Sequence, residues 1–149
     1  MSAIGKRVIY VGPADGADHK PLNVEGLAVA ATAPGSVVGQ SGSGLTKLTD
    51  AAGDFIKEFL VADKDQQRSK SVDDDWTIAE NMVAVAPRSG EFVNVLCITA
   101  QAITIGIALA RSGTAGALKI AGGATDEIVG YAAETVTTTA TQLVAVRVA

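Results

Sequence analysis

The sequence predicts an all-β fold: a compact sandwich or barrel of short strands with at most one short helix. Apolar residues recur with period two, as expected when the side chains of a strand alternate between two faces. Glycine and proline turn signals interrupt the apolar runs roughly every ten residues, and no strongly amphipathic helix is apparent. With 149 residues and no evident linker, the chain is interpreted as one domain that can bury a hydrophobic core.

The composition restricts the classes of function. The chain is 48% hydrophobic but only 4% aromatic, so Val, Ile, Leu and Ala must supply most of the core volume. A formal net charge of −4 argues against a nucleic-acid partner, because binding to a phosphate backbone requires clustered Lys and Arg. Cys97 is the single cysteine, which excludes an internal disulfide and is consistent with a reducing compartment.

Residues 1–21 are predicted to form an N-terminal arm and loop. Residues 6–11 contain a short apolar strand that ends at Gly12 and Pro13, and a turn-rich loop follows over residues 14–21. The start of the chain lacks the apolar run and the cleavage site of a secretory signal.

The following segment alternates between extended and turn-forming stretches. Residues 22–31 are expected to be extended and to lead into a turn at Pro34 and Gly35. The glycine-rich residues 39–44 are interpreted as either the tip of a flexible hairpin or a surface loop. Residues 45–49 show only a weak alternation of apolar and polar side chains.

Residues 50–62 are compatible with a helix or a strand. Phe55 and Phe59 share a face at either spacing, and we favour a strand from about Phe55 because Gly53 weakens a helix start. The segment 63–75 that follows has mixed charges and no apolar periodicity. It is therefore expected to form an exposed polar excursion.

The two clearest predicted strands are residues 91–99 and 102–110. In the second of these, an apolar residue occurs at every other position from Ile103 to Leu109. The uncharged run 92–110 is about long enough to cross a membrane as a helix. The period-two pattern favours a strand instead, so we expect no membrane association.

The C-terminal stretch, residues 116–148, is predicted to contain two or three strands. Turns are expected at Gly122 and Gly123 and in the threonine-rich piece after Glu134. Alternation places Leu143, Ala145 and Arg147 on one face of the last strand, and Val144, Val146 and Val148 on the other. A valine-rich strand needs a partner for its backbone groups, so we expect the end of the chain to be part of the sheet.

No pattern for catalysis, a cofactor or a metal is apparent, and we expect a protein that is not an enzyme. His19 is the only histidine and lies in a loop, and Cys97 lies in an apolar strand, where a buried, unreactive thiol is expected. Asp73, Asp74 and Asp75 do not match the spacing of a calcium loop and are expected to be solvated. The glycines of residues 39–44 lack the lysine and hydroxyl of a phosphate loop.

Five residues are candidates for contact with a partner protein. Ile4, Val8, Ile9 and Tyr10 belong to the N-terminal arm, and Trp76 follows the polar segment. Scarce aromatic residues beside polar loops are favoured at interfaces, because one large ring buries a large area. For Trp76 the alternative is that its side chain fills the core, and the sequence does not decide between the two.

Several stretches share features with one family of structural proteins. They are residues 128–134 (Ile-Val-Gly-Tyr-Ala-Ala-Glu), residues 143–148 (Leu-Val-Ala-Val-Arg-Val), residues 26–36 (Gly-Leu-Ala-Val-Ala-Ala-Thr-Ala-Pro-Gly-Ser) and residues 90–96 (Gly-Glu-Phe-Val-Asn-Val-Leu). In outline, the chain resembles the head decoration proteins of tailed bacteriophages, also called capsid cement or stabilisation proteins. The polar segment 63–75 has no counterpart in this resemblance.

The resemblance implies a structural virion protein that binds the outer surface of an assembled phage capsid and stabilises contacts between major capsid subunits. Its partners would be the major capsid protein and further copies of itself, with a homotrimer expected first and a homodimer next. It would be made in the bacterial host cytoplasm, would be located on the capsid surface, and would need no cofactor. We expect residues 1–11 to dock by adding a strand to the sheet edge of a neighbour.

Two other classes of function stay open. One is a different phage structural component, such as a tail tube or head-completion protein. The other is a small β-barrel module that binds a sugar or another small molecule. Only six aromatic residues are present, which makes an aromatic-lined pocket difficult to build.

Overall fold

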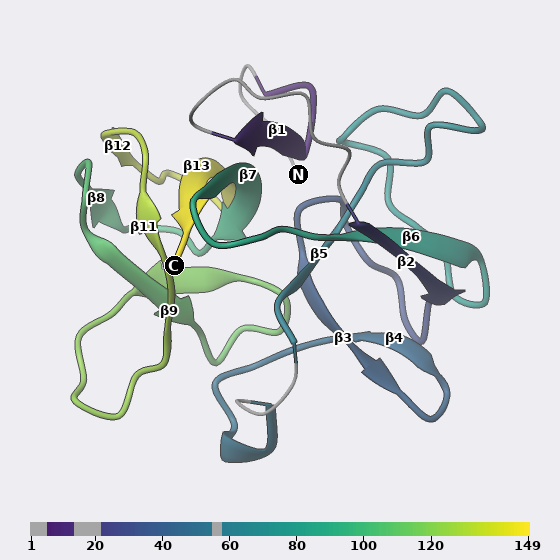
Figure 1. Cartoon of the computed structure of the whole chain (residues 1–149), viewed down its shortest axis with the longest axis horizontal. Coiled ribbons are helices and arrows are strands. Elements are labelled where there is room, and N and C mark those ends of the chain that lie inside the picture. The colour runs from purple at the N-terminus through teal and green to yellow at the C-terminus, as the bar shows by residue number, and fades with distance from the viewer. Residues whose placement is uncertain (1–5, 14–21, 55–57) are drawn as a thin grey trace.

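A computed structural model of the chain describes residues 6–13, 22–54 and 58–149 (Figure 1). These residues form thirteen β-strands and one 3₁₀ turn, η1 (Ala52–Asp54), with no α-helix, so the prediction of an all-β fold is confirmed. In chain order, the strands are β1 (Tyr10–Pro13), β2 (Leu22–Leu27), β3 (Val37–Ser41), β4 (Gly44–Lys47), β5 (Leu60–Ala62), β6 (Asn81–Ala86), β7 (Glu91–Cys97), β8 (Ala102–Ile103), β9 (Ala108–Arg111), β10 (Leu118–Ile120), β11 (Ile128–Ala132), β12 (Val136–Thr137) and β13 (Gln142–Val148).

Five strands close into a barrel in the order β7, β10, β9, β11 and β13, because β13 also pairs with β7. Neighbours in this ring are antiparallel except for β10 and β7, which are parallel. The interior is filled by buried aliphatic side chains, which include Val93, Val95, Leu109, Val144 and Val146. The last strand is thus paired on both edges, which confirms the prediction that the end of the chain belongs to the sheet.

A second sheet has the order β2, β6, β5, β3 and β4 and lies beside the barrel (Figure 1). Its central strands are buried on both faces, so they are nearly continuous apolar runs. Val37, Val61 and Val85 pack into the barrel core, whereas Val38 packs with Trp76 in a second cluster. The two sheets therefore share one hydrophobic interior.

The predicted turn at Pro34 and Gly35 covers part of the barrel. The carbonyl oxygen of Gly35 accepts a hydrogen bond from the Leu96 amide at 2.9 Å, next to the stretch of β7 that pairs with β1. Gly35 has a φ of 89°, and a Cβ at this position would lie 2.2 Å from Leu143 Cδ2. The position therefore requires glycine. This close contact explains why Leu143 is buried although it lies on the face of β13 opposite to Val144.

The prediction of one strand over residues 102–110 is wrong. The segment forms β8 and β9, which are separated by a turn in which the Ile107 amide donates to the Thr104 carbonyl at 3.1 Å. Gly106 in this turn has a φ of 87°, which an L-residue adopts only at a cost. As a result, Ile103 is buried but the Ile105 side chain is 69% exposed.

One other boundary differs from the predictions, one is not tested, and one open alternative is decided. Gly12 and Pro13 do not end the first strand but belong to β1, where they pair with β7. The ambiguous segment 50–62 contains η1 and β5, while residues 55–57, where we expected a strand to begin, lie outside the described residues. Residues 39–44 form the tip of the β3–β4 hairpin, so the first of the two interpretations is correct.

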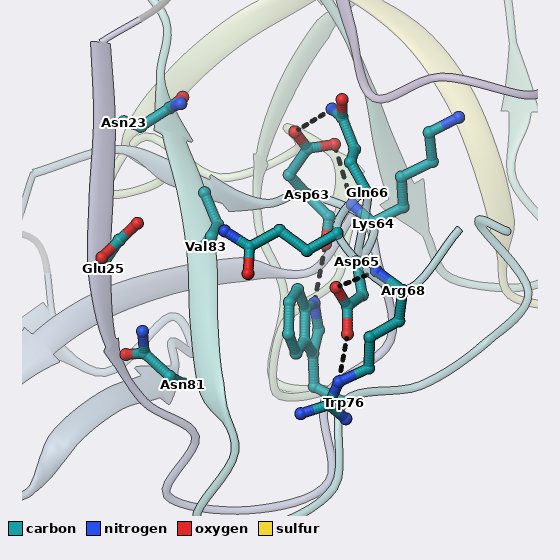
Figure 2. Close-up of a pocket in the computed structure, with 11 residues that line it drawn as sticks. Asn23, Glu25, Asp63, Lys64, Asp65, Gln66, Arg68, Trp76, Asn81 and Val83 are labelled. Carbon is teal, nitrogen blue, oxygen red and sulfur yellow. Dashed lines mark hydrogen bonds and ion pairs between the residues drawn. The ribbon is translucent and has the colours of Figure 1, made fainter. Parts of the chain in front are cut away.

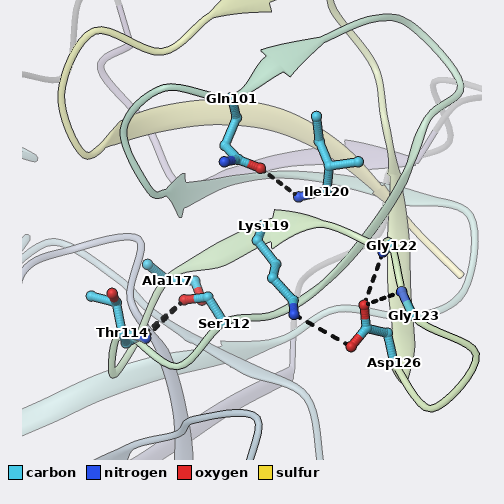
Figure 3. A network of polar contacts seen from close by, with 9 residues as sticks. All are labelled: Gln101, Ser112, Thr114, Ala117, Lys119, Ile120, Gly122, Gly123 and Asp126. Carbon is cyan, nitrogen blue, oxygen red and sulfur yellow. Dashed lines mark hydrogen bonds and ion pairs between the residues drawn. The ribbon is translucent and has the colours of Figure 1, made fainter.

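Short polar networks fix the loops around β10, as Figure 3 shows. In the predicted turn at Gly122 and Gly123, the Asp126 carboxylate accepts hydrogen bonds from both amides at 2.9 Å, and Lys119 Nζ lies 3.4 Å away. The amide hydrogen bonds, aided by Lys119, lower the pKa of Asp126. On the other side of β10, the side chain of Gln101 accepts from the Ile120 amide at 3.0 Å.

No helix in the described ranges is long and apolar enough to span a membrane.

Candidate functional site

Three of the N-terminal contact candidates, Val8, Ile9 and Tyr10, lie on or next to β1, a strand at the end of the barrel sheet. Val8 is 45% exposed, and Val11, which the sequence analysis did not single out, is 55% exposed. Ile9 is buried and belongs to the barrel core. Ile4 lies outside the described residues.

Several hydrogen bonds attach β1 to the body of the protein. The Tyr10 hydroxyl donates to the Glu91 carboxylate, and Asn94 Nδ2 donates to the Val8 carbonyl at 2.8 Å. Burial, and next the hydrogen bond to Glu91, raise the pKa of Tyr10 to about 12. The backbone of Ile9 also accepts a hydrogen bond from the Asn94 amide at 2.7 Å. Residues 8–13 are therefore not the separate arm that we expected, because Ile9 fills the core and residues 10–13 pair with β7.

One edge of β1 pairs with β7, and the other, outer edge faces away from it. β7 is the only described strand that pairs with β1, so its other edge carries no strand from this part of the chain. Val11 is exposed on this strand, and Val8 is exposed just before it. An unpaired edge beside exposed apolar side chains is a surface on which another protein can dock by strand addition.

Trp76, the other contact candidate, fills the core of the second sheet and is 4% exposed. Its backbone forms a bridge with Thr32, with two hydrogen bonds of 2.8 and 3.0 Å. Its indole Nε1 donates to the Asp63 carbonyl at 2.7 Å (Figure 2). The structure therefore places Trp76 in the core and not at an interface.

The segment 63–75 is only partly the exposed excursion that we expected. Asp63, Asp65 and Val72 are buried, whereas the three consecutive aspartates that end the segment are exposed. The carboxylate of Asp63 accepts from the Lys64 amide at 2.8 Å and from Gln66 Nε2 at 3.0 Å. Local hydrogen bonds thus allow acidic side chains to be buried where the periodicity of the sequence gives no such signal.

A polar pocket of about 280 Å³ lies between this segment and strands β2 and β6 (Figure 2). The segment contributes Asp63, Asp65 and Arg68 to its wall, and Trp76 also lines it. Burial raises the pKa of Asp63. Arg68 Nε lies 3.4 Å from the Asp65 carboxylate, and Arg68 Nη1 lies 3.1 Å from Glu80 Oε1. Arg68 thus compensates part of the negative charge of Asp65 and Glu80.

A second concave surface, which the sequence analysis missed, lies on the outside of the barrel and has a volume of about 400 Å³. Tyr131, Arg147 and Phe92 are direct cross-strand neighbours on β11, β13 and β7, and all three line it. We refer to these three residues as the aromatic row. Ile105 also lines the groove, from the β8–β9 turn. That turn is held against β11 by a hydrogen bond of 2.8 Å from the Gly106 amide to the Ala132 carbonyl.

The structure places Cys97 and the described acidic residues, two of the groups that could carry chemistry. Cys97 is buried, and burial, with a smaller effect from the charge of Glu134, raises the pKa of its thiol to about 12. Such a thiol is not a nucleophile near neutral pH. In the part of the chain that the structure describes, no three His, Cys, Asp or Glu residues are grouped so that they could hold a metal ion. His19 lies outside that part.

No protein-family model and no curated protein matches the chain.

Proposed function

We propose that this protein binds the outer surface of an assembled phage capsid and stabilises contacts between major capsid subunits. The observation that carries the proposal is β1, an edge strand that is fixed to the barrel, with the exposed side chain of Val11 on the strand and that of Val8 just before it. The resemblance of residues 26–36, 90–96 and 128–134 to head decoration proteins supports the same role. The protein is then made in the host cytoplasm and acts on the virion.

The physical basis of this role is the thermodynamic linkage between binding of the protein and assembly of the shell. A protein that binds only the assembled shell lowers the free energy of that state relative to separate subunits. Many copies on one shell add their contributions, so each contact can be modest. Such a role requires a stable fold with a docking edge, and it requires no catalytic residue and no cofactor.

The docking edge is tested by co-sedimentation of the purified protein with expanded shells from the same source. Val11→Glu places a charge on the exposed surface of β1, and we expect it to weaken shell binding at least tenfold (about 1.4 kcal/mol). Ile128→Glu is the matched control, because Ile128 is also exposed but lies on β11. Binding of Val11→Glu at the level of wild type would refute the docking role of β1.

A second candidate function is the binding of a small polar ligand, which the pocket beside Trp76 favours. The pocket contains the mixed hydrogen-bonding groups that a sugar requires. However, Trp76 is almost completely buried, so its ring offers little surface for a sugar to stack on. Two of the carboxylates, Asp63 and Asp65, already have partners within the segment 63–68. We therefore rank this function below capsid binding. Nothing in the described residues specifically favours a tail tube or head-completion role.

A further inference from the structure

The aromatic row has the composition of a protein-binding site. Phe92 and Tyr131 are two of the six aromatic residues in the chain, and they flank Arg147 on neighbouring strands. Aromatic residues and arginine are the types that contribute most to binding at protein interfaces. Ile105, which is 69% exposed, adds an aliphatic rim. None of the ion pairs that the described residues form involves Arg147.

The same chain carries a surface of complementary chemistry. Ile78 is 68% exposed in the turn of residues 77–80, which precedes β6. Asp75, three residues earlier, is also exposed and takes part in none of the ion pairs of the described residues. This pair therefore combines an aliphatic side chain with a negative charge, which matches the aromatic groove and its positive charge.

The turn that exposes Ile78 is rigidly held. The Ala79 amide donates to the Ala28 carbonyl at 2.8 Å, and the Ala28 amide donates to the Glu80 carbonyl at 2.8 Å. Ala79 has a φ of 67°, a left-handed conformation that alanine adopts only at a cost. A strained, anchored turn keeps Ile78 exposed, so little backbone conformational entropy is lost when a partner binds the turn.

The two surfaces lie in different parts of the molecule. The aromatic row belongs to the barrel, whereas residues 77–80 lead into β6 of the second sheet, and Figure 1 shows these regions on opposite sides along the long axis. They are thus placed to meet between molecules. A contact between two different surfaces of identical chains is head-to-tail, and it closes into a ring or continues as a filament.

We propose that the groove formed by Phe92, Arg147, Tyr131 and Ile105 binds the Ile78 turn of a second copy of this chain, with Asp75 pairing with Arg147. This inference goes beyond capsid binding and does not depend on it, because it concerns the purified chain alone.

The test is sedimentation velocity of the full chain over a concentration series, with charge-reversal variants. We expect wild type to associate as its concentration rises. Arg147→Asp and Asp75→Arg each place like charges opposite one another, and we expect each to weaken association at least tenfold. The double variant Arg147→Asp/Asp75→Arg restores opposite charges in every contact, so we expect its association to recover. Ile78→Glu should abolish association.

Two controls separate this contact from other causes. Ile128→Glu and Val11→Glu change exposed apolar side chains outside the groove and the turn, so both should associate as wild type does. Far-UV circular dichroism verifies that each variant is folded. A wild type that stays monomeric at every concentration, single reversals that associate normally, or a double variant that does not recover would each overturn the proposal. None of these results bears on shell binding through β1.

Discussion

Replacing Gly130 by alanine is expected to disrupt the pairing of β11 with β13 and to destabilise the barrel. Gly130 pairs with Val148 on one side and with Leu109 on the other, so it lies between two strands of the barrel. A Cβ at position 130 would lie 2.6 Å from Val146 Cγ1 and 2.7 Å from the Arg147 carbonyl oxygen. Carbon atoms normally approach to about 3.5–4.0 Å. Val146 is fully buried and β-branched, so it cannot rotate away, and β13 itself must move.

The expected loss in the free energy of unfolding can be calculated from these contacts. Overpacking a closed core costs about 1–3 kcal/mol. Displacing β13 weakens its hydrogen bonds with β11, each of which contributes about 0.5–1.5 kcal/mol. Alanine also lowers the entropy of the unfolded chain, which offsets about 0.4–1 kcal/mol. The expected net loss in the free energy of unfolding is about 2–3 kcal/mol, a large fraction of the ~5–15 kcal/mol of a typical domain.

Urea unfolding, followed by the fluorescence of the buried Trp76, measures this loss. Gly122→Ala is the matched control, because no heavy atom lies within 4 Å of the added Cβ and the backbone is not in the left-handed region. The control should fall within about 0.5 kcal/mol of wild type. A Gly130→Ala variant that is as stable as the control would show that β11 and β13 do not approach as closely as the structure indicates.

Three further predictions concern buried side chains. Trp76→Ala should lower the free energy of unfolding by about 3–5 kcal/mol, because the ring fills the core of the second sheet. Urea unfolding followed by circular dichroism measures this loss, and a loss below about 1 kcal/mol would contradict the placement of Trp76 in the core. Cys97 should not react with a thiol reagent in the native protein and should react fully in denaturant, since burial protects it; rapid native labelling would contradict its placement. Because burial raises the folded-state pKa of Asp63 above its ordinary value of 3.8, the contribution of Asp63 to stability is fully present below that value and is lost as pH rises through the folded-state pKa. Asp63→Asn should therefore gain stability relative to wild type as pH rises from below 3.8 through the folded-state pKa, and a pH-independent difference would contradict this.

Much of the fold could be predicted from the sequence, because a strand that is buried on one face alternates apolar and polar residues. The C-terminal strand was identified in this way, with Val144 and Val146 inside the barrel and Arg147 outside. The same signal failed for residues 102–110, where Ile105 continues the pattern but is exposed. Gly106 was the available sign of a break, since a glycine inside a strand pattern often marks a bend.

The contact surfaces were harder to predict. An apolar segment near the N-terminus looks the same whether it forms a separate arm or an edge strand, so Ile9 was included with Val8 although only Val8 is exposed. The aromatic row joins three strands that are distant in sequence, and only their register brings Phe92 and Tyr131 to either side of Arg147. That register is a tertiary property, and no local pattern encodes it.

The proposed capsid role is tested most directly by density-gradient fractionation of an infected-cell lysate, followed by detection of this chain in every fraction. If the protein decorates the capsid, it migrates with the DNA-filled particles and is absent from the precursor shells. If it remains in the soluble, low-mass fractions, the capsid role is contradicted, and ligand binding in the pocket beside Trp76 becomes the leading function.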